Sequence, residues 1–275
     1  MANDGLPLDV VEKIIDIVGA ESEEYCNQFE DLPSLKACAL VCHSFLALCR
    51  KHIFAHVALG PSSRPSDDLN HLLSNSPHLA VYIRKLDYQI NENEFVPKRL
   101  PWLSSMFKKL VKLQKLKISY WGSDSEPGRR LDWMSSSERN ILLPLLHLPT
   151  LTNISLSTIQ NFPLADLAGC VSLKELQIYS LQCSTDVGKF LDALPATPVM
   201  LERLVIHDGN VKTLLRLYHA QRPDGKPIID PTSLKIISAT ITRLDLLTEL
   251  CGICRNLHKI DLTSMSLLRL IPSSI

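Results

Sequence analysis

The stretch Leu113-Gln114-Lys115-Leu116-Lys117-Ile118 sets the fold that the sequence predicts. Its apolar residues occupy the first, fourth and sixth positions, so the last two fall on one face of a short strand. The same spacing, or a close variant, occurs in seven segments between residues 83 and 262, at intervals of 22 to 38 residues. The segments are Ile83/Leu86/Tyr88, Leu113/Leu116/Ile118, Leu151/Ile154/Leu156, Leu173/Leu176/Ile178, Leu201/Leu204/Ile206, Leu234/Ile237/Ala239 and Leu257/Ile260/Leu262.

Segments with the apolar spacing of helices separate these copies, for example 102–110, 187–194, 211–220 and 244–254. A short strand followed by a helix, repeated at this scale, resembles the leucine-rich repeats. Each such unit has a strand too short to be stable alone, and stacking of neighbours lets the leucines form one continuous core. A sheet built from ordinary βαβ units shares the alternation and is the competing interpretation. Both interpretations place the chain in the α/β class.

The N-terminal segment, residues 6–18, has the pattern of an amphipathic helix. Pro7 suits a first helical turn, where its missing N–H would have no partner. We expect Gly19 to end the helix. One wide apolar face is formed at helical spacing by Val10, Val11, Ile14, Ile15, Ile17 and Val18.

A second segment, residues 35–54, is apolar on almost every side. We expect a helix in it that ends with Leu40-Val41-Cys42-His43-Ser44-Phe45. A helix without a polar face has to be buried all round, and about fifty residues of short helices cannot bury it by themselves. Part of this surface therefore meets the rest of the chain or a partner protein.

Together the two segments resemble an F-box, in particular those of F-box proteins from mushroom-forming fungi. The resemblance implies that residues 1–60 dock onto the Skp-type adaptor of a cullin–RING ubiquitin ligase. Residues 61–275 would form a leucine-rich-repeat-like solenoid, beginning at the turn-rich joint 61–68. Carried over by position, the docking residues are Leu6, Pro7, Val11, Ile14, Ile15, Leu40, Val41, Cys42 and Phe45.

The resemblance also implies that the solenoid holds a substrate protein. Side chains alternate along a strand, so the residues beside the repeat leucines would face the concave side. Tyr179, Arg203 and His207 are the best anchors by residue type. The predicted substrate-binding residues are Lys117, Ser155, Gln177, Tyr179, Arg203, His207 and Asp261.

A non-catalytic repeat scaffold, whose N-terminal helices only cap the solenoid, is the alternative to a ligase adaptor. The exposure of the apolar face of the first helix distinguishes the scaffold from the ligase adaptor. A cap would bury the helix face that carries Val10, Val11, Ile14 and Ile15 against the first repeats, whereas a docking module would leave an apolar patch facing solvent.

Composition adds further expectations. The 29 basic and 29 acidic residues balance, so no overall field attracts nucleic acid or a membrane. The chain has eight cysteines, and its N-terminal residues lack the pattern of a signal peptide. The apolar stretches are too short to span a bilayer. We therefore expect a cytoplasmic or nuclear protein with reduced thiols. The run 98–117 holds seven basic residues and no acid, and is either a solvated face or a contact for phosphate or an acidic peptide.

No motif for catalysis is found. The phosphate-binding loop, the dinucleotide pattern and the nucleophile elbow are all absent. Cys251 and Cys254 have redox spacing but lie in a predicted repeat helix, so we interpret them as core residues, with a thiol oxidoreductase as a third alternative. Cys38, Cys42 and Cys49 fall on one helical stripe, which fits packing better than zinc. We therefore expect no enzyme activity, no cofactor and no metal.

Overall fold

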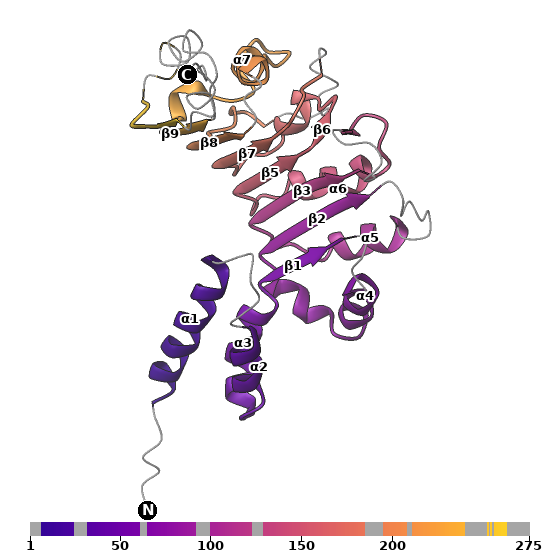
Figure 1. Ribbon diagram of the computed structural model, residues 1–275, viewed down its shortest axis with the longest axis vertical. Helices are drawn as coiled ribbons and strands as arrows, with labels where there is room; N and C mark the ends of the chain where they lie inside the picture. Colours follow the sequence, from indigo (N-terminus) through magenta and orange to yellow (C-terminus); the bar gives the residue numbers. More distant parts are fainter. Residues whose placement is uncertain are drawn as a thin grey trace, which may run out of the picture.

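The computed structural model describes residues 7–24, 32–60, 65–91, 100–122, 129–184, 195–207, 211–239, 252, 254 and 256–262. It is an elongated α/β molecule, with three helices at one end and a large parallel sheet beyond them (Figure 1). The helical end comprises α1 (Leu8–Glu24), α2 (Leu32–Ala39) and α3 (His43–Ile53). The remaining elements are β1 (His56–Leu59), α4 (Pro65–Asn75), η1 (Pro77–Tyr82), β2 (Lys85–Asn91), α5 (Leu100–Phe107), β3 (Lys115–Trp121), β4 (Leu131–Asp132), α6 (Glu138–Leu146), β5 (Asn153–Ser157), β6 (Ile159–Gln160), η3 (Leu164–Leu167), β7 (Glu175–Tyr179), β8 (Arg203–His207), α7 (Val211–His219), η4 (Pro231–Ser233), β9 (Ile236–Ala239) and β10 (Lys259–Leu262).

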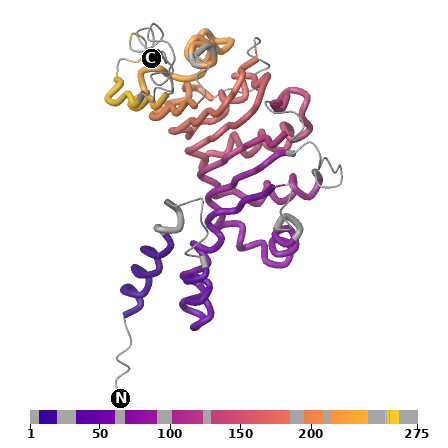
Figure 2. Tube along the Cα trace, in the orientation of Figure 1, coloured from indigo at the N-terminus to yellow at the C-terminus, as the bar shows by residue number. Residues whose placement is uncertain are grey.

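The strands of the large sheet lie side by side in chain order, β1-β2-β3-β5-β7-β8-β9-β10. The colours of Figure 2 therefore advance in one direction along the sheet. The register aligns equivalent positions of the repeated spacing: Leu116 pairs with Leu86 on one side and with Ile154 on the other. All seven segments predicted as strands contain one. The structure adds β1, which precedes the first copy.

The main core lies on one face of this sheet. Leu116 and Ile118 of β3 are fully buried there, and side chains of α5 and α6 such as Met106 and Leu142 pack over that face. Burial of each such side chain contributes about 1.5 to 3 kcal/mol, so the ladder of apolar residues holds neighbouring strands together. The opposite face of the sheet carries the alternate residues, such as Lys115 and Lys117. We call it the open face.

The N-terminal helices enclose a small core of their own. Val11 and Ile15 of α1 pack there against Leu35 of α2 and Cys49 of α3. This cluster is separate from the core beneath the sheet. The helical end is therefore held together by its own apolar contacts.

The prediction that Gly19 ends the first helix was wrong, because α1 continues to Glu24. Gly19 instead allows α3 to approach α1. A β-carbon at this position would collide with the imidazole ring of His52. A glycine that permits close packing and a glycine that ends a helix look alike in a single sequence.

The prediction of one helix through Leu40 and Phe45 was also wrong. The N–H groups of Leu40 and Val41 donate to the carbonyls of Ala37 and Cys38, each at 3.1 Å, and close a turn between α2 and α3. The backbone of Cys42 is extended at the start of α3. Leu40 and Val41 are consequently exposed on the turn instead of buried on a helix, and Cys42 does not share a stripe with the buried Cys49.

Of the predicted repeat helices, 102–110 corresponds to α5 and 211–220 to α7, each within three residues at its ends. The segment 187–194 and most of 244–254, including Cys251, lie outside the described residues. Cys254 is described and buried.

Candidate functional site

Exposed apolar side chains concentrate on the N-terminal helices. Of the fourteen large apolar side chains that are exposed in the described part of the chain, six lie between Leu8 and Val41. Val10, Ile14 and Ile17 form one stripe of α1, next to the stripe that faces the small core. Leu40 and Val41 are 88% and 68% exposed at the turn that follows α2. These five residues define what we call the apolar helical surface.

The structure separates the nine predicted docking residues into groups. Val11 and Ile15 are only 7% and 3% exposed, so they support the helices from inside and cannot be reached by a partner. Phe45 is half-buried, and Leu6 lies outside the described residues. The predicted docking residues that face solvent are Pro7, Ile14, Leu40, Val41 and Cys42.

An ionic clamp joins α1 to α3 beside the small core. Lys51 Nζ lies 2.7 Å from Asp16 Oδ1 and 3.0 Å from Glu12 Oε1, and His52 Nε2 lies 2.8 Å from the same Asp16 oxygen. The hydrogen bonds of Lys51 and His52 lower the pKa of Asp16, and the bond to Asp16 raises the pKa of Lys51. Exposed pairs of this kind contribute little individually, about 0 to 1 kcal/mol, but together they fix how α3 lies on α1.

A hollow of about 470 Å³ opens on the sheet above β5. The hollow forms because side chains of different length lie next to one another. β5 places only Asn153, Ser155 and Ser157 on the open face, while β3 and β7 on either side carry longer side chains there. A second hollow of about 550 Å³ shares Asp87, Lys117 and Ser157 with the first and extends to the exposed Trp121.

The two walls of the hollow above β5 differ in charge. Lys115 and Lys117 of β3 form one wall, and Glu175, Gln177 and Tyr179 of β7 form the other. The Glu175 carboxylate accepts hydrogen bonds from Asn153 Nδ2 at 2.9 Å and from Gln177 Nε2 at 2.7 Å. Arg203 Nε lies 4.0 Å from it. The Glu175 oxygens therefore have hydrogen-bond partners within the protein, whereas the ammonium groups of Lys115 and Lys117 have none among the described residues and only the charge of Asp87 nearby.

The open face brings most of the predicted substrate-binding residues together. Four of the seven, Lys117, Ser155, Gln177 and Tyr179, line the hollow above β5. His207 on the next strand stacks on Tyr179. Arg203 also lies on β8, near Glu175. Asp261 lies on β10 at the far end of the sheet, where it pairs with Lys259 at 2.9 Å.

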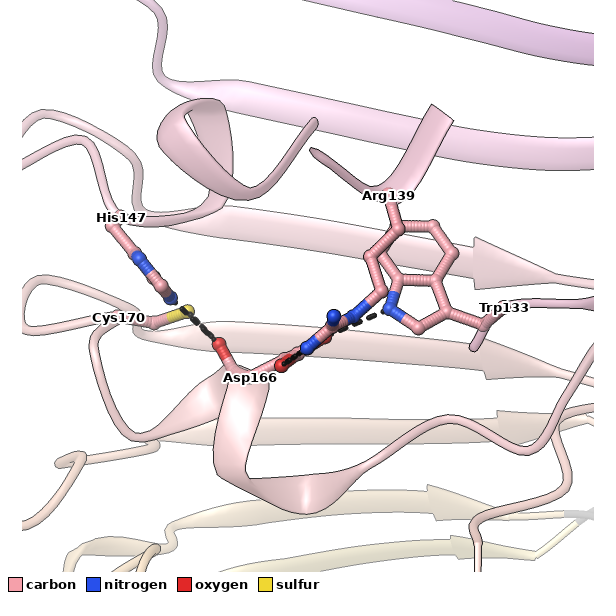
Figure 3. A network of polar contacts seen from close by, with 5 residues as sticks. All are labelled: Trp133, Arg139, His147, Asp166 and Cys170. Carbon is pink, nitrogen blue, oxygen red and sulfur yellow. Dashed lines mark hydrogen bonds and ion pairs between the residues drawn. The ribbon is translucent and has the colours of Figure 1, made fainter. Parts of the chain in front are cut away.

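A buried polar cluster in the main core, shown in Figure 3, was not predicted from the sequence. The Asp166 carboxylate, in a residue only 4% exposed, accepts hydrogen bonds from Trp133 Nε1 at 2.8 Å and from Arg139 Nε and Nη2 at 3.0 and 2.8 Å. Its backbone carbonyl is 2.9 Å from His147 Nε2 and also accepts from the Cys170 thiol. The sequence offered one signal for this cluster, the acidic Asp166 within the otherwise apolar run 162–168, because a buried carboxylate needs polar partners.

The cluster stabilises the fold. Both carboxylate oxygens of Asp166 accept hydrogen bonds within it, and burial raises the pKa of the Cys170 thiol well above its ordinary value. A thiol that stays protonated is a poor nucleophile. The cluster joins α6 and Trp133, the residue after β4, to η3, which fixes the connections behind β5.

In the described ranges, no three His, Cys, Asp or Glu side chains gather as a metal site would require. Within the same ranges, none of the helices combines the length and apolar character needed to cross a bilayer.

Comparisons with known proteins found no match: no family model fits the chain, and no curated protein is similar to it. Any function assigned to the chain therefore rests on the geometry of the apolar helical surface and of the open face of the sheet.

Proposed function

We propose that the chain is the substrate-recognition adaptor of a Skp–cullin–F-box ubiquitin ligase in the cytoplasm or nucleus. Its N-terminal helices would act as an F-box that docks onto the Skp-type adaptor. The sheet and its helices would act as a leucine-rich-repeat solenoid that binds a substrate protein. The protein itself would perform no bond chemistry, because holding a substrate near the ubiquitin-charged enzyme raises the rate by proximity.

The exposure of the N-terminal helices carries the proposal. They bury Val11 and Ile15 in a core of their own, yet leave Ile14 48% exposed and Leu40 and Val41 more so. Exposed apolar side chains gathered on one small unit mark a surface for another protein. Helices that served only as a cap would have buried these side chains against the first strands.

The order of the strands supports the repeat part of the proposal. Doubly wound α/β sheets reverse their strand order at a switch point. Here every described strand of the large sheet lies next to its predecessor, with equivalent leucine positions in register. Addition of units in a single direction is the arrangement expected of stacked repeats.

A scaffold without a ligase role is supported by one observation. The Ala55 carbonyl, just after α3, accepts hydrogen bonds from the N–H groups of Arg84 at 2.9 Å and Lys85 at 2.8 Å. The helical end is thus joined directly to the first strand pair, as a cap would be. This contact involves the end of α3 and leaves the apolar helical surface uncovered.

Binding of a purified Skp-type adaptor to the intact chain tests the proposal. Ile14→Asp/Val41→Asp changes two exposed residues, so the double variant should stay folded, as circular dichroism can verify, and should lose the adaptor. Val111→Asp/Val171→Asp is the matched control, since both of these valines are exposed in the sheet region. Absence of binding by the intact chain, or equal binding by both double variants, would overturn the ligase role.

A further inference from the structure

Lysines crowd one side of the open face. Lys85 and Lys115 are direct partners in the register of β2 and β3, and Lys117 lies two residues further along β3. Lys85 has a counter-charge, Asp87 Oδ2, at 4.0 Å. The ammonium groups of Lys115 and Lys117 make no hydrogen bond and no ion pair within 4 Å with a described residue, although the charge of Lys117 acts on Asp87. Like charges directly opposite each other on neighbouring strands are destabilising, so an anion bound here would relieve a repulsion already present in the sheet.

The hollow beside these lysines has the shape of a trough along β5. Its floor consists of Asn153, Ser155 and Ser157, and its walls are the longer side chains of β3 and β7. A five-residue strand is about 16 Å long, so the trough matches a short extended peptide. The Ser155 hydroxyl makes no hydrogen bond to a described residue and is available to a peptide backbone.

We propose that this trough binds an extended acidic segment of a protein, with Asp or Glu carboxylates pairing with Lys115 and Lys117. Alternate residues of an extended segment point the same way, so two carboxylates separated by one residue can meet both lysines of β3. The inference rests on the proposed function only in calling that protein a ligase substrate.

Carboxylates fit the trough better than phosphates. Asp87 and Glu175 line the same hollow, and its lining of described residues includes no arginine. Burial alone would raise the pKa of Asp87, but the contact with His56 and the charges of Lys85 and Lys117 hold that pKa below its ordinary value, so Asp87 stays ionised. Two fixed negative charges repel a doubly charged phosphate more than a carboxylate, and the lysines lack the forked geometry with which arginine binds phosphate.

Fluorescence anisotropy of the full chain with a labelled peptide tests the inference. The probe is a peptide of about twelve residues in which Glu and Ser alternate, long enough to cover the trough. Peptides with Gln or phosphoserine in place of each Glu serve as comparisons. We expect the Glu peptide to bind, the Gln peptide not to bind, and added salt to weaken binding, because exposed ion pairs are screened.

Two matched pairs of variants locate the binding. Lys115→Glu/Lys117→Glu should weaken binding of the Glu peptide by about tenfold or more. Lys108→Glu/Lys112→Glu makes the same change of charge on exposed lysines outside the hollow and should leave binding unchanged. Ser155→Tyr should weaken binding similarly by filling the floor without changing charge. Ser238→Tyr, at the equivalent position of β9, should not.

The inference is overturned if the intact chain does not bind the Glu peptide, or if either trough variant binds it as tightly as the intact chain does. Binding of the phosphoserine peptide without the Glu peptide would assign the trough to phosphorylated segments and also overturn it. Adaptor binding by the intact chain is a separate measurement. An intact chain that binds the adaptor but not the Glu peptide contradicts only this inference, and one that binds the Glu peptide but not the adaptor contradicts only the proposed function.

Discussion

The phenol ring of Tyr179 lies flat on the imidazole of His207, with ring centroids 4.4 Å apart and planes 7° from parallel. The two residues are direct partners in the register of β7 and β8. The stack stands at the carboxyl end of the trough wall, and Tyr179 also donates a hydrogen bond to Gln177 Oε1 at 3.4 Å. A short series of contacts thus positions this wall from Glu175 to His207.

A double-mutant cycle should detect the stack. Tyr179→Ala and His207→Ala are expected to be coupled by about 0.5 to 1.5 kcal/mol, the range for stacked rings. The measurement is urea unfolding of the two single variants and the double variant. Tyr179→Ala combined with Lys259→Ala, a change two strands beyond His207, should be additive. Additivity of the stacked pair itself would show that the contact adds nothing to stability.

Asp166→Asn should destabilise the fold by about 3 kcal/mol or more, because it leaves the guanidinium of Arg139 without its counter-charge. Adding Arg139→Met to this variant should recover part of the loss, since no unpaired charge then remains. Denaturant unfolding measures both effects. Asp261→Asn, which breaks a more exposed ion pair, serves as the control and should cost less than about 1 kcal/mol. Equal losses for Asp166→Asn and Asp261→Asn would contradict the role assigned to the cluster.

Gly19→Ala tests why a glycine lies inside α1. Helix propensity alone predicts a gain of about 1 kcal/mol for this change. We expect a loss of stability instead, because the new methyl group would collide with the His52 ring. Thermal unfolding followed by circular dichroism gives the sign, and Gly19→Ala/His52→Ala should regain helix stability. A more stable Gly19→Ala variant would show that the two helices do not pack as described.

Acid should loosen the helical end. The folded state lowers the pKa of Asp16 below its ordinary value of 3.8, so Asp16 contributes stability above that value and loses it as the pH falls through the folded pKa. The helix signal in circular dichroism, recorded between neutral pH and strong acid, should show this loss. Asp16→Asn should be less stable at neutral pH and less sensitive to acid, whereas Asp68→Asn should keep the acid sensitivity of the parent chain. An unchanged acid response in Asp16→Asn would contradict a stabilising role for the ionic clamp.

The strands were predictable because their information is local. Three apolar positions in six residues determine which side of a strand is buried, and this pattern identified seven strands of the large sheet. It could not identify β1, because His56-Val57-Ala58-Leu59 lacks the spacing and owes its pairing to β2. The polar cluster around Asp166 depends on contacts between residues 4 to 33 positions apart, and no spacing rule reports these.

The two surfaces were predictable in part for the same reason. Strand alternation placed Lys117, Ser155, Gln177 and Tyr179 on one face, but the trough exists because β5 carries short side chains between two strands with long ones. In the helices, the sequence could not separate Ile14 from Ile15. Which of the two faces the core depends on how α3 folds back at Leu40 and Val41, and that turn was not anticipated.

Hydrogen exchange of the intact chain, with and without a purified Skp-type adaptor, tests the central proposal most directly. We predict that the adaptor slows exchange within residues 8–24 and 32–53 and leaves the strands of the open face unchanged. Slower exchange confined to the strands, or no change anywhere at saturating adaptor, would contradict docking through the apolar helical surface.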